Sequence, residues 1–133
     1  IHDSVRPLLG QDIISSNIAI CKAYGYAITG IKCREAILES EDGFSTSVSI
    51  PRDKLIRTQT PQTFCLGNII NIHEEAKQKG IVDSVASCTL IAEVGGYEMH
   101  IVPGSEKNIK ITTVEDLEIL KALMHTSKDE WLK

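Results

Sequence analysis

The sequence lacks the marks of several large classes of protein. Its cysteines form no C-x-x-C pair and have no histidine at metal-ligand spacing. We therefore expect buried free thiols in a reducing compartment, the cytoplasm, and no zinc site. These cysteines are Cys21, Cys33, Cys65 and Cys88. No apolar run approaches the roughly 20 residues of a membrane span, so nothing in this stretch predicts a membrane-embedded segment.

Basic clusters and the common nucleotide-loop motifs are missing too. The 14 lysines and arginines are scattered and are outnumbered by 18 aspartates and glutamates, for a formal net charge of -4. This balance argues against a nucleic-acid or acidic-membrane partner and favours a small molecule or a protein. The patterns G-x-G-x-x-G, G-x-x-x-x-G-K-[ST] and G-x-S-x-G are all absent. This stretch therefore carries no glycine-rich phosphate loop.

The sequence does contain enough apolar residues for one core. It has 133 residues, 42% of them hydrophobic, which predicts a single domain over residues 1–133 rather than a disordered chain. Helical and strand patterns alternate along it, which predicts an α/β sheet covered by helices. The predicted helices are 11–24, 66–79, 84–94 and a last one from Thr112 or Thr113, and the predicted strands are 26–32, 97–102 and 108–111.

Periodicity also predicts which helix faces are buried. The spacing of apolar residues marks three such faces. They are Ile14, Ile18 and Cys21 in the first helix, Leu66, Ile69, Ile70 and His73 in the second, and Val114, Leu117, Leu120 and Met124 in the last. The run Thr112-Thr113-Val114-Glu115 has the form of a capping box and predicts the start of the last helix.

Residues 33–59 depart from this alternation. Short β-prone pieces at 36–39, 44–50 and 55–57 surround Glu41-Asp42-Gly43, and Asp-Gly is a strong hairpin signal. We expect a β-arm that leaves the core.

The opening run Ile1-His2-Asp3-Ser4-Val5-Arg6-Pro7 gathers an imidazole, a carboxylate and a guanidinium before a proline. It is typical of a buried strand that turns into a loop. Because chain ends usually fray, a strand at this place predicts that an upstream part of the fold precedes it.

Four motifs in order resemble the family of methylerythritol-phosphate and ribitol-5-phosphate cytidylyltransferases. They are the opening run 1–7, Thr60-Pro61-Gln62-Thr63-Phe64, Val102-Pro103-Gly104, and Asn108-Ile109-Lys110-Ile111-Thr112-Thr113 with Glu115-Asp116-Leu117. The resemblance implies a three-layer α/β fold with helices on both faces of the sheet. This fold is Rossmann-like, of the nucleotide-diphospho-sugar transferase type, and is incomplete because the family's CTP loop lies upstream of the first motif.

The same resemblance implies roles on the nucleotide side of the site. Asp3 would hold the divalent metal, Mg²⁺, that bridges the CTP phosphates, as suits a hard oxygen ligand. Arg6 would brace this loop, and Lys110 would reach the phosphates at the reacting centre. Without the resemblance, Asp3 is a turn-capping residue, Arg6 a structural ion-pair partner and Lys110 a solvated lysine.

On the acceptor side, Arg52 would grip the phosphate of the sugar alcohol, since a guanidinium can hold phosphate with two parallel hydrogen bonds. The resemblance places the arm across a two-fold interface, so Arg52 would act in the partner's site of a homodimer. Thr60 would donate its hydroxyl to the same substrate, while Gln62 would contribute to acceptor binding and shape the turn with Pro61. Read alone, Thr60 to Gln62 is a loop that enters a helix.

Two departures from the family pattern fall on the acceptor pocket. Ala36 stands where many members carry a threonine, and Val85-Ala86 replaces a Thr-Asp pair. The predicted reaction joins CMP from CTP to a polyol phosphate, with ribitol 5-phosphate, a surface-polymer precursor, preferred over 2-C-methyl-D-erythritol 4-phosphate of isoprenoid biosynthesis. Two alternatives stay open: a non-catalytic dimerisation and acceptor-binding piece, and a nucleotidyltransferase that uses another NTP.

Overall fold

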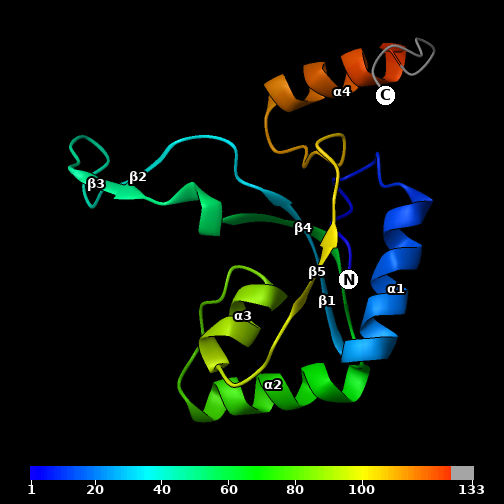
Figure 1. The fold of residues 1–133 in the computed structure, drawn as a ribbon, viewed down its shortest axis with the longest axis vertical. Coiled ribbons are helices and arrows are strands. Elements are labelled where there is room, and N and C mark those ends of the chain that lie inside the picture. Colours follow the sequence, from blue (N-terminus) through cyan, green and yellow to red (C-terminus); the bar gives the residue numbers. More distant parts are fainter. Residues whose placement is uncertain (127–133) are drawn as a thin grey trace.

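The computed structural model describes residues 1–126, and its centre is a three-stranded sheet of order β4-β1-β5 (Figure 1). Strand β1 runs antiparallel to β4 and parallel to β5. The strands are β1 (Tyr26–Lys32), β4 (Ile56–Phe64) and β5 (His100–Pro103), and the helices are α1 (Gln11–Tyr24), α2 (Leu66–Gln78), α3 (Ser87–Val94) and α4 (Val114–Thr126). The predicted mixed α/β architecture is confirmed. None of the described helices could cross a membrane.

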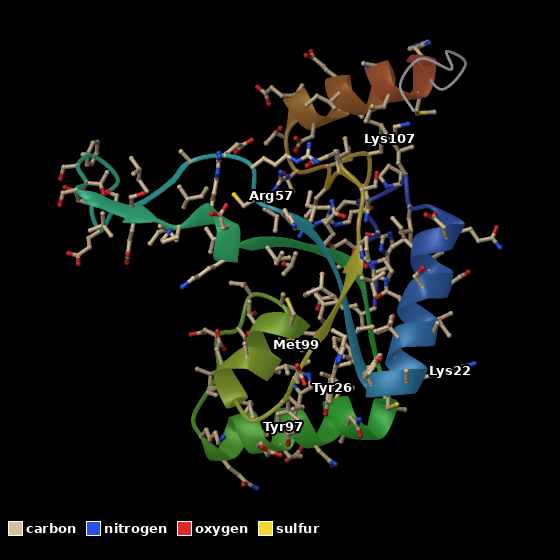
Figure 2. All side chains as sticks on the ribbon, in the orientation of Figure 1. Lys22, Tyr26, Arg57, Tyr97, Met99 and Lys107 are labelled. Atoms are coloured by element: carbon tan, nitrogen blue, oxygen red, sulfur yellow. The ribbon has the colours of Figure 1, made fainter. Side chains whose placement is uncertain are left out.

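Helices cover both faces of the sheet because side chains of a strand alternate in direction. Ala27 of β1 packs with Cys21 of α1 and Val102 of β5 on one face. Tyr26 points to the other face, where it joins the apolar cluster between α2 and α3. Its ring lies 5.7 Å from that of Tyr97, and Figure 2 shows both with Met99 on this side of the sheet.

Helix α1 buries Ile13, Asn17 and Cys21, whereas Ile14 and Ile18 of the predicted face are exposed. The reason is a polar contact inside the core. Asn17 Nδ2 donates hydrogen bonds to Thr29 Oγ1 of β1 at 2.8 Å and to the Ile13 carbonyl at 3.0 Å. A pattern that counts only apolar residues misses this face because its central member is an asparagine.

The predicted face of α2 is also displaced. Ile69, Ile72 and Ala76 are buried against α3, while Leu66 is 74% exposed and Ile70 is exposed as well. The cysteine prediction was wrong at one place: Cys65, just before α2, is exposed, and the other three thiols are buried.

Helix α4 was predicted to bury an apolar stripe, and this was wrong. Val114 is 73% exposed, and Leu117 and Met124 are exposed too. In Figure 1 the helix stands away from the sheet and from the other helices. Periodicity identifies the stripe but cannot say whether another element covers it.

The start of α4 is capped one residue later than predicted. Asp116, not Glu115, completes the capping box with Thr113. Asp116 Oδ2 accepts hydrogen bonds from the backbone N–H groups of Thr112 and Thr113, and Thr113 Oγ1 accepts one from Asp116 N. These bonds satisfy N–H groups that have no partner within the helix.

The β-arm is a hairpin of β2 (Ile37–Glu39) and β3 (Val48–Ile50), followed by a 3-10 turn, η1 (Arg52–Lys54). It extends away from the sheet (Figure 1). At its tip the Asp42 carboxylate accepts hydrogen bonds from Phe44 N and Ser45 N, both at 2.9 Å. The predicted piece 55–57 is instead the beginning of β4, which belongs to the central sheet.

Three further local predictions were wrong. Residues 108–111 form a loop rather than a strand, and residues 1–10 contain turns and no strand. Ile1 does exchange two backbone hydrogen bonds with Gln62, at 2.8 and 2.9 Å. Residues 60–62 are no turn, because β4 continues through them to Phe64, with a cis peptide bond at Thr60-Pro61.

Candidate active site

A carboxylate between two cations lies at one end of the sheet. Asp3 and Arg6 belong to one turn, in which Arg6 N donates to the Asp3 carbonyl at 3.1 Å. Arg6 Nε also lies 3.1 Å from Asp3 Oδ2, and Lys110 Nζ approaches the same oxygen to 3.5 Å. The side chains are 10% exposed for Arg6, 30% for Asp3 and 49% for Lys110. The structure thus brings together three predicted site residues, two of which are more than 100 positions apart.

Thr60 supports this turn from β4. Its hydroxyl accepts a hydrogen bond from Asp3 N at 3.0 Å and lies 2.9 Å from His2 Nδ1. His2 Nε2 lies 3.1 Å from the Arg6 carbonyl, which can only accept. In the neutral imidazole, Nε2 therefore carries the proton and Nδ1 accepts from the threonine hydroxyl. His2 is hydrogen-bonded at both ring nitrogens, although its side chain is exposed.

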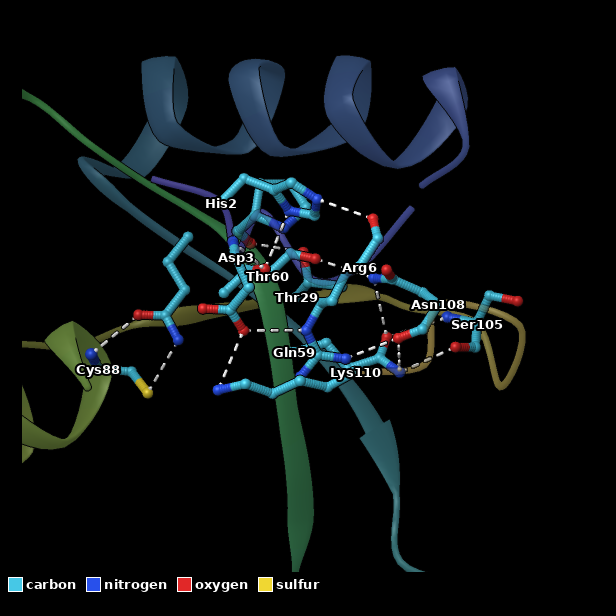
Figure 3. A network of polar contacts seen from close by, with 12 residues as sticks. His2, Asp3, Arg6, Thr29, Gln59, Thr60, Cys88, Ser105, Asn108 and Lys110 are labelled. Atoms are coloured by element: carbon cyan, nitrogen blue, oxygen red, sulfur yellow. Dashed lines mark hydrogen bonds and ion pairs between the residues drawn. The ribbon is translucent and has the colours of Figure 1, made fainter. Parts of the chain in front are cut away.

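Asn108 connects the turn to the loop that carries Lys110. Its carbonyl accepts a 2.6 Å hydrogen bond from Arg6 Nη1. Its side chain is fully buried, and Nδ2 donates to the Thr60 carbonyl at 2.8 Å. Figure 3 shows these contacts converging on β4. The backbone around Asn108 therefore positions both cations at Asp3: Arg6 bonds to the Asn108 carbonyl, and Lys110 follows two residues later.

Gln62 lies further along the same strand, and its amide is fully engaged away from this cluster. The side chain is buried, Oε1 accepts from Cys88 N at 3.0 Å, and Nε2 lies 3.2 Å from Cys88 Sγ. These contacts connect β4 to the first turn of α3. A part in acceptor binding stays a prediction for Gln62.

Arg52 is not beside Asp3. It donates from Nη1 to the Arg34 carbonyl at 2.7 Å on the exposed arm. It lines a pocket of about 780 Å³ together with Lys32, Arg34 and Glu106. Arg52 and the Asp3 cluster thus lie at different pockets in one chain.

A smaller pocket of about 250 Å³ adjoins the Asp3 cluster. Arg6 and Lys110 line it, together with Arg57, Glu106 and Asp116. Glu106 borders both pockets, and its carboxylate lies 3.5 Å from Arg57 Nη1. The hydrogen bonds from Thr112 and Thr113 lower the pKa of the Asp116 carboxyl below its usual range. Asp116 therefore contributes a fixed negative charge to the wall of this pocket.

The donors fit a divalent metal only in part. Asp3 Oδ2 is shared by two cations, while Oδ1 accepts no hydrogen bond from residues 1–126. No group of three or more His, Cys, Asp or Glu side chains within that range could hold an ion. One open carboxylate oxygen suits Mg²⁺, which is usually bound through one or two carboxylates, substrate phosphates and water.

Comparison with known proteins matches these elements to one enzyme family. The family model described as 2-C-methyl-D-erythritol 4-phosphate cytidylyltransferase matches residues 1–126. The chain belongs to this family. Among solved structures, the cytidylyltransferase of that name from Thermus thermophilus superposes with a TM-score of 0.81 at 25% identity, over 93% of this chain and 60% of the other. The Francisella tularensis enzyme gives 0.78 at 28% identity, over 91% of this chain and 56% of the other.

Curated relatives in the cytidylyltransferase family carry two substrate names. A ribitol-5-phosphate cytidylyltransferase from Streptococcus agalactiae is 36% identical over 130 residues, which are 98% of this chain and 54% of the relative. A 2-C-methyl-D-erythritol 4-phosphate cytidylyltransferase from Clostridium acetobutylicum is 38% identical over 125 residues, 93% of this chain and 53% of the relative. The chain thus spans about half the length of the curated relatives it matches.

A buried glutamine that precedes Thr60 was not predicted from the sequence. Gln59 is 5% exposed and makes hydrogen bonds to Ser105 and Asn108, which belong to the loop 104–111 between β5 and α4. Arg57 and Glu106 were not predicted either; they form an ion pair, and Glu106 borders both pockets. Gln59 stands in the polar run Thr-Gln-Thr-Pro-Gln, which gives no local sign that this part of the strand is buried.

Proposed function

We propose that this chain is part of a cytidylyltransferase that transfers CMP from CTP to a polyol phosphate and releases pyrophosphate. The observation that carries the proposal is the meeting of Asp3, Arg6 and Lys110 at one carboxylate oxygen, in a member of this family. In the reaction a phosphate oxygen of the acceptor attacks the α-phosphorus of CTP. The bond from that phosphorus to the bridging oxygen breaks, and its electrons leave with pyrophosphate.

The residues contribute position and charge. Lys110 supplies a positive charge beside the reacting phosphates, which offsets the negative charge that accumulates between two anionic reactants. Arg6 holds the Asp3 carboxylate and the Asn108 carbonyl at once, which orients the turn. Asp3 would hold Mg²⁺, and the ion, when bound, neutralises phosphate charge. No proton need be removed, because the attacking phosphate oxygen is already ionised.

The acceptor site is proposed to need a second copy of the chain. Arg52 lies on the arm, in a pocket other than the one beside Asp3. The arm also exposes apolar side chains, with Phe44, Leu38 and Val48 all open to solvent. An exposed apolar hairpin favours association with another chain. In a homodimer, each arm would bring Arg52 to the phosphate of the acceptor in the other protomer's site.

For the acceptor we propose ribitol 5-phosphate rather than 2-C-methyl-D-erythritol 4-phosphate. Relatives of both names match this chain about equally well, at 36% and 38% identity, so identity does not choose between them. The support is Ala36 and the Val85-Ala86 pair, which carry no hydroxyl or carboxylate. A pocket that loses these polar groups is expected to change its preference among polyols.

The test is pyrophosphate release by the full-length protein with Mg²⁺, in a panel of four NTPs and both polyol phosphates. We expect turnover with CTP only and a higher kcat/KM for ribitol 5-phosphate. Preference for another NTP would overturn the assignment of the nucleotide, and preference for the methylerythritol substrate that of the acceptor.

A calorimetric titration separates the fragment hypotheses. CTP and Mg²⁺ are added to residues 1–133 alone and to the full-length protein. We expect tight binding only in the full-length protein, because this stretch has no glycine-rich phosphate loop. Tight binding by residues 1–133 alone would contradict the proposal that the nucleotide is bound by the remaining half.

A further inference from the structure

We propose that Gln59 is a positioning residue for the transfer reaction: its amide fixes the loop 104–111 so that Lys110 and Arg6 meet at Asp3. This inference rests on the proposed function. It adds a residue of β4 whose side-chain hydrogen bonds go to Ser105 and Asn108 rather than to Asp3 or Lys110.

The amide of Gln59 is used entirely on that loop. Nε2 donates to the Ser105 carbonyl at 2.8 Å and approaches the Asn108 carbonyl to 3.4 Å. Oε1 accepts from Ser105 N at 3.2 Å and lies 3.5 Å from Asn108 Nδ2. Figure 3 shows the amide between β4 and the loop. A buried amide with both ends engaged in this way fixes the position of the backbone that it contacts.

The loop is also held at its two ends and through the Asn108 side chain, whose Nδ2 donates to the Thr60 carbonyl at 2.8 Å. It leaves β5 with a bond from Gly104 N to the Gly30 carbonyl at 3.0 Å and reaches the opening turn with one from Ile111 N to the Val5 carbonyl at 2.9 Å. Within residues 1–126, no strand pairs with residues 104–111. Gln59 therefore holds the middle of a segment that sheet hydrogen bonds do not fix.

The carbonyl of Asn108 links Gln59 to the cations. It accepts from Arg6 Nη1 at 2.6 Å, and Gln59 Nε2 approaches it to 3.4 Å. Lys110 follows two residues later, with Nζ 3.5 Å from Asp3 Oδ2. A shift of Asn108 would therefore change both cation positions relative to Asp3.

Gly104 is a second sign that the loop is built around this amide. A Cβ at that position would collide with Gln59 Oε1, and it would lie 2.9 Å from Thr29 Cγ2 and 3.2 Å from Ile31 Cγ2. Glycine lets the backbone approach the amide closely.

The test uses the full-length protein with Gln59→Met, which keeps the length of the side chain and removes its hydrogen bonds. We expect kcat to fall about 10- to 100-fold, since a displacement of about 1 Å can cost that much. The KM values for CTP and the polyol phosphate should change less than about threefold, because the groups that bind the substrates remain. Ile72→Val, which trims the core at α2, controls for a general loss of stability and should keep the wild-type kcat.

A double-mutant cycle distinguishes positioning from a structural role. If Gln59 acts through Lys110, then Lys110→Met costs at least about tenfold less in the Gln59→Met background than in the wild type. Independent effects would multiply, and that result would overturn the proposal. Gln59→Asn, whose amide is one methylene too short, serves as the second variant and should lose kcat in the same way.

Amide hydrogen exchange supplies a readout that does not depend on turnover. Exchange of peptides covering residues 104–111 should accelerate in both Gln59 variants and not in Ile72→Val. A wild-type protein inactive with every NTP and polyol phosphate would refute the proposed function, whereas an active wild type with normal kcat in Gln59→Met would refute this inference alone.

Discussion

Two regions that carry predicted site residues are built in opposite ways. The inner half of β4 is buried, and its polar groups are satisfied by three different elements: Gln59 by the loop 104–111, Thr60 by the opening turn and Gln62 by α3. The β-arm is exposed along its hairpin and is held mainly by local bonds at its tip. One chain therefore brings Asp3, Arg6 and Lys110 together by itself, whereas the role proposed for Arg52 would depend on what the arm contacts.

The largest expected effect on turnover comes from the Asp3 cluster, which one chain assembles by itself. In the full-length protein, Lys110→Met should lower kcat by about 100- to 1,000-fold, because a charge aimed at the reacting phosphates is lost. Lys110 is half exposed, so the fold should survive, and circular dichroism and Tm serve as checks. Lys107→Met, a neighbouring exposed lysine, is the matched control and should stay active. Wild-type turnover in Lys110→Met would remove Lys110 from the mechanism.

The second expected effect concerns the arm. Arg52→Met in the full-length protein should raise KM for the polyol phosphate by about 10- to 100-fold and leave KM for CTP unchanged, since a charge-assisted contact to the acceptor is removed. Lys54→Met, on the same turn, is the matched control.

Mixing variants tests whether Arg52 acts across an interface. A heterodimer of Arg52→Met and Lys110→Met chains has one site with both native residues if the arm reaches into the partner. Co-expression should then restore activity that neither variant has alone at limiting substrate. No recovery in purified heterodimers would place Arg52 in the site of its own chain. Both regions would then be positioned within one chain, and the difference between them would disappear.

Sequence patterns could predict elements better than faces. The four helices, the strand 26–32 and the Asp-Gly hairpin depend on neighbouring residues, and the structure confirms them. The buried faces of α1 and α2 were misplaced because burial depends on partners far along the chain, as when Thr29 draws Asn17 into the core. Helix α4 shows the same limit, because an apolar stripe in the sequence does not indicate which element packs against it.

The site divides in a similar way. Motifs identified Asp3, Arg6 and Lys110, and the structure brings them together because Thr60 of β4 and Asn108 hold the turn of Asp3 and Arg6 beside the loop 104–111. Their catalytic roles remain predictions. The burial of Gln59 was not predicted, because a glutamine between two threonines in a polar run resembles a solvated residue. Only the path of the loop 104–111, which no local pattern predicts, places it in the interior.

The smallest effect concerns the arm's tip, whose stability is local. Hydrogen bonds from the Ser45 and Phe44 N–H groups, followed by the Ser45 and Ser40 hydroxyls, lower the pKa of the Asp42 carboxyl far below its usual value. Because the folded-state pKa is depressed, the stabilisation is present above the unfolded value of about 3.9 and is lost as the pH falls through the folded pKa. At about pH 3 the tip should therefore still be closed, and the ¹³C shift of the Asp42 carboxyl should still report the ionised form. Ser40→Ala, which removes one of these donors, should raise the pH midpoint of the Asp42 carboxyl titration. A titration midpoint of the Asp42 carboxyl near pH 4 in the wild type would contradict these hydrogen bonds. The fold of the arm, like the proposed role of Arg52, would then depend on a partner.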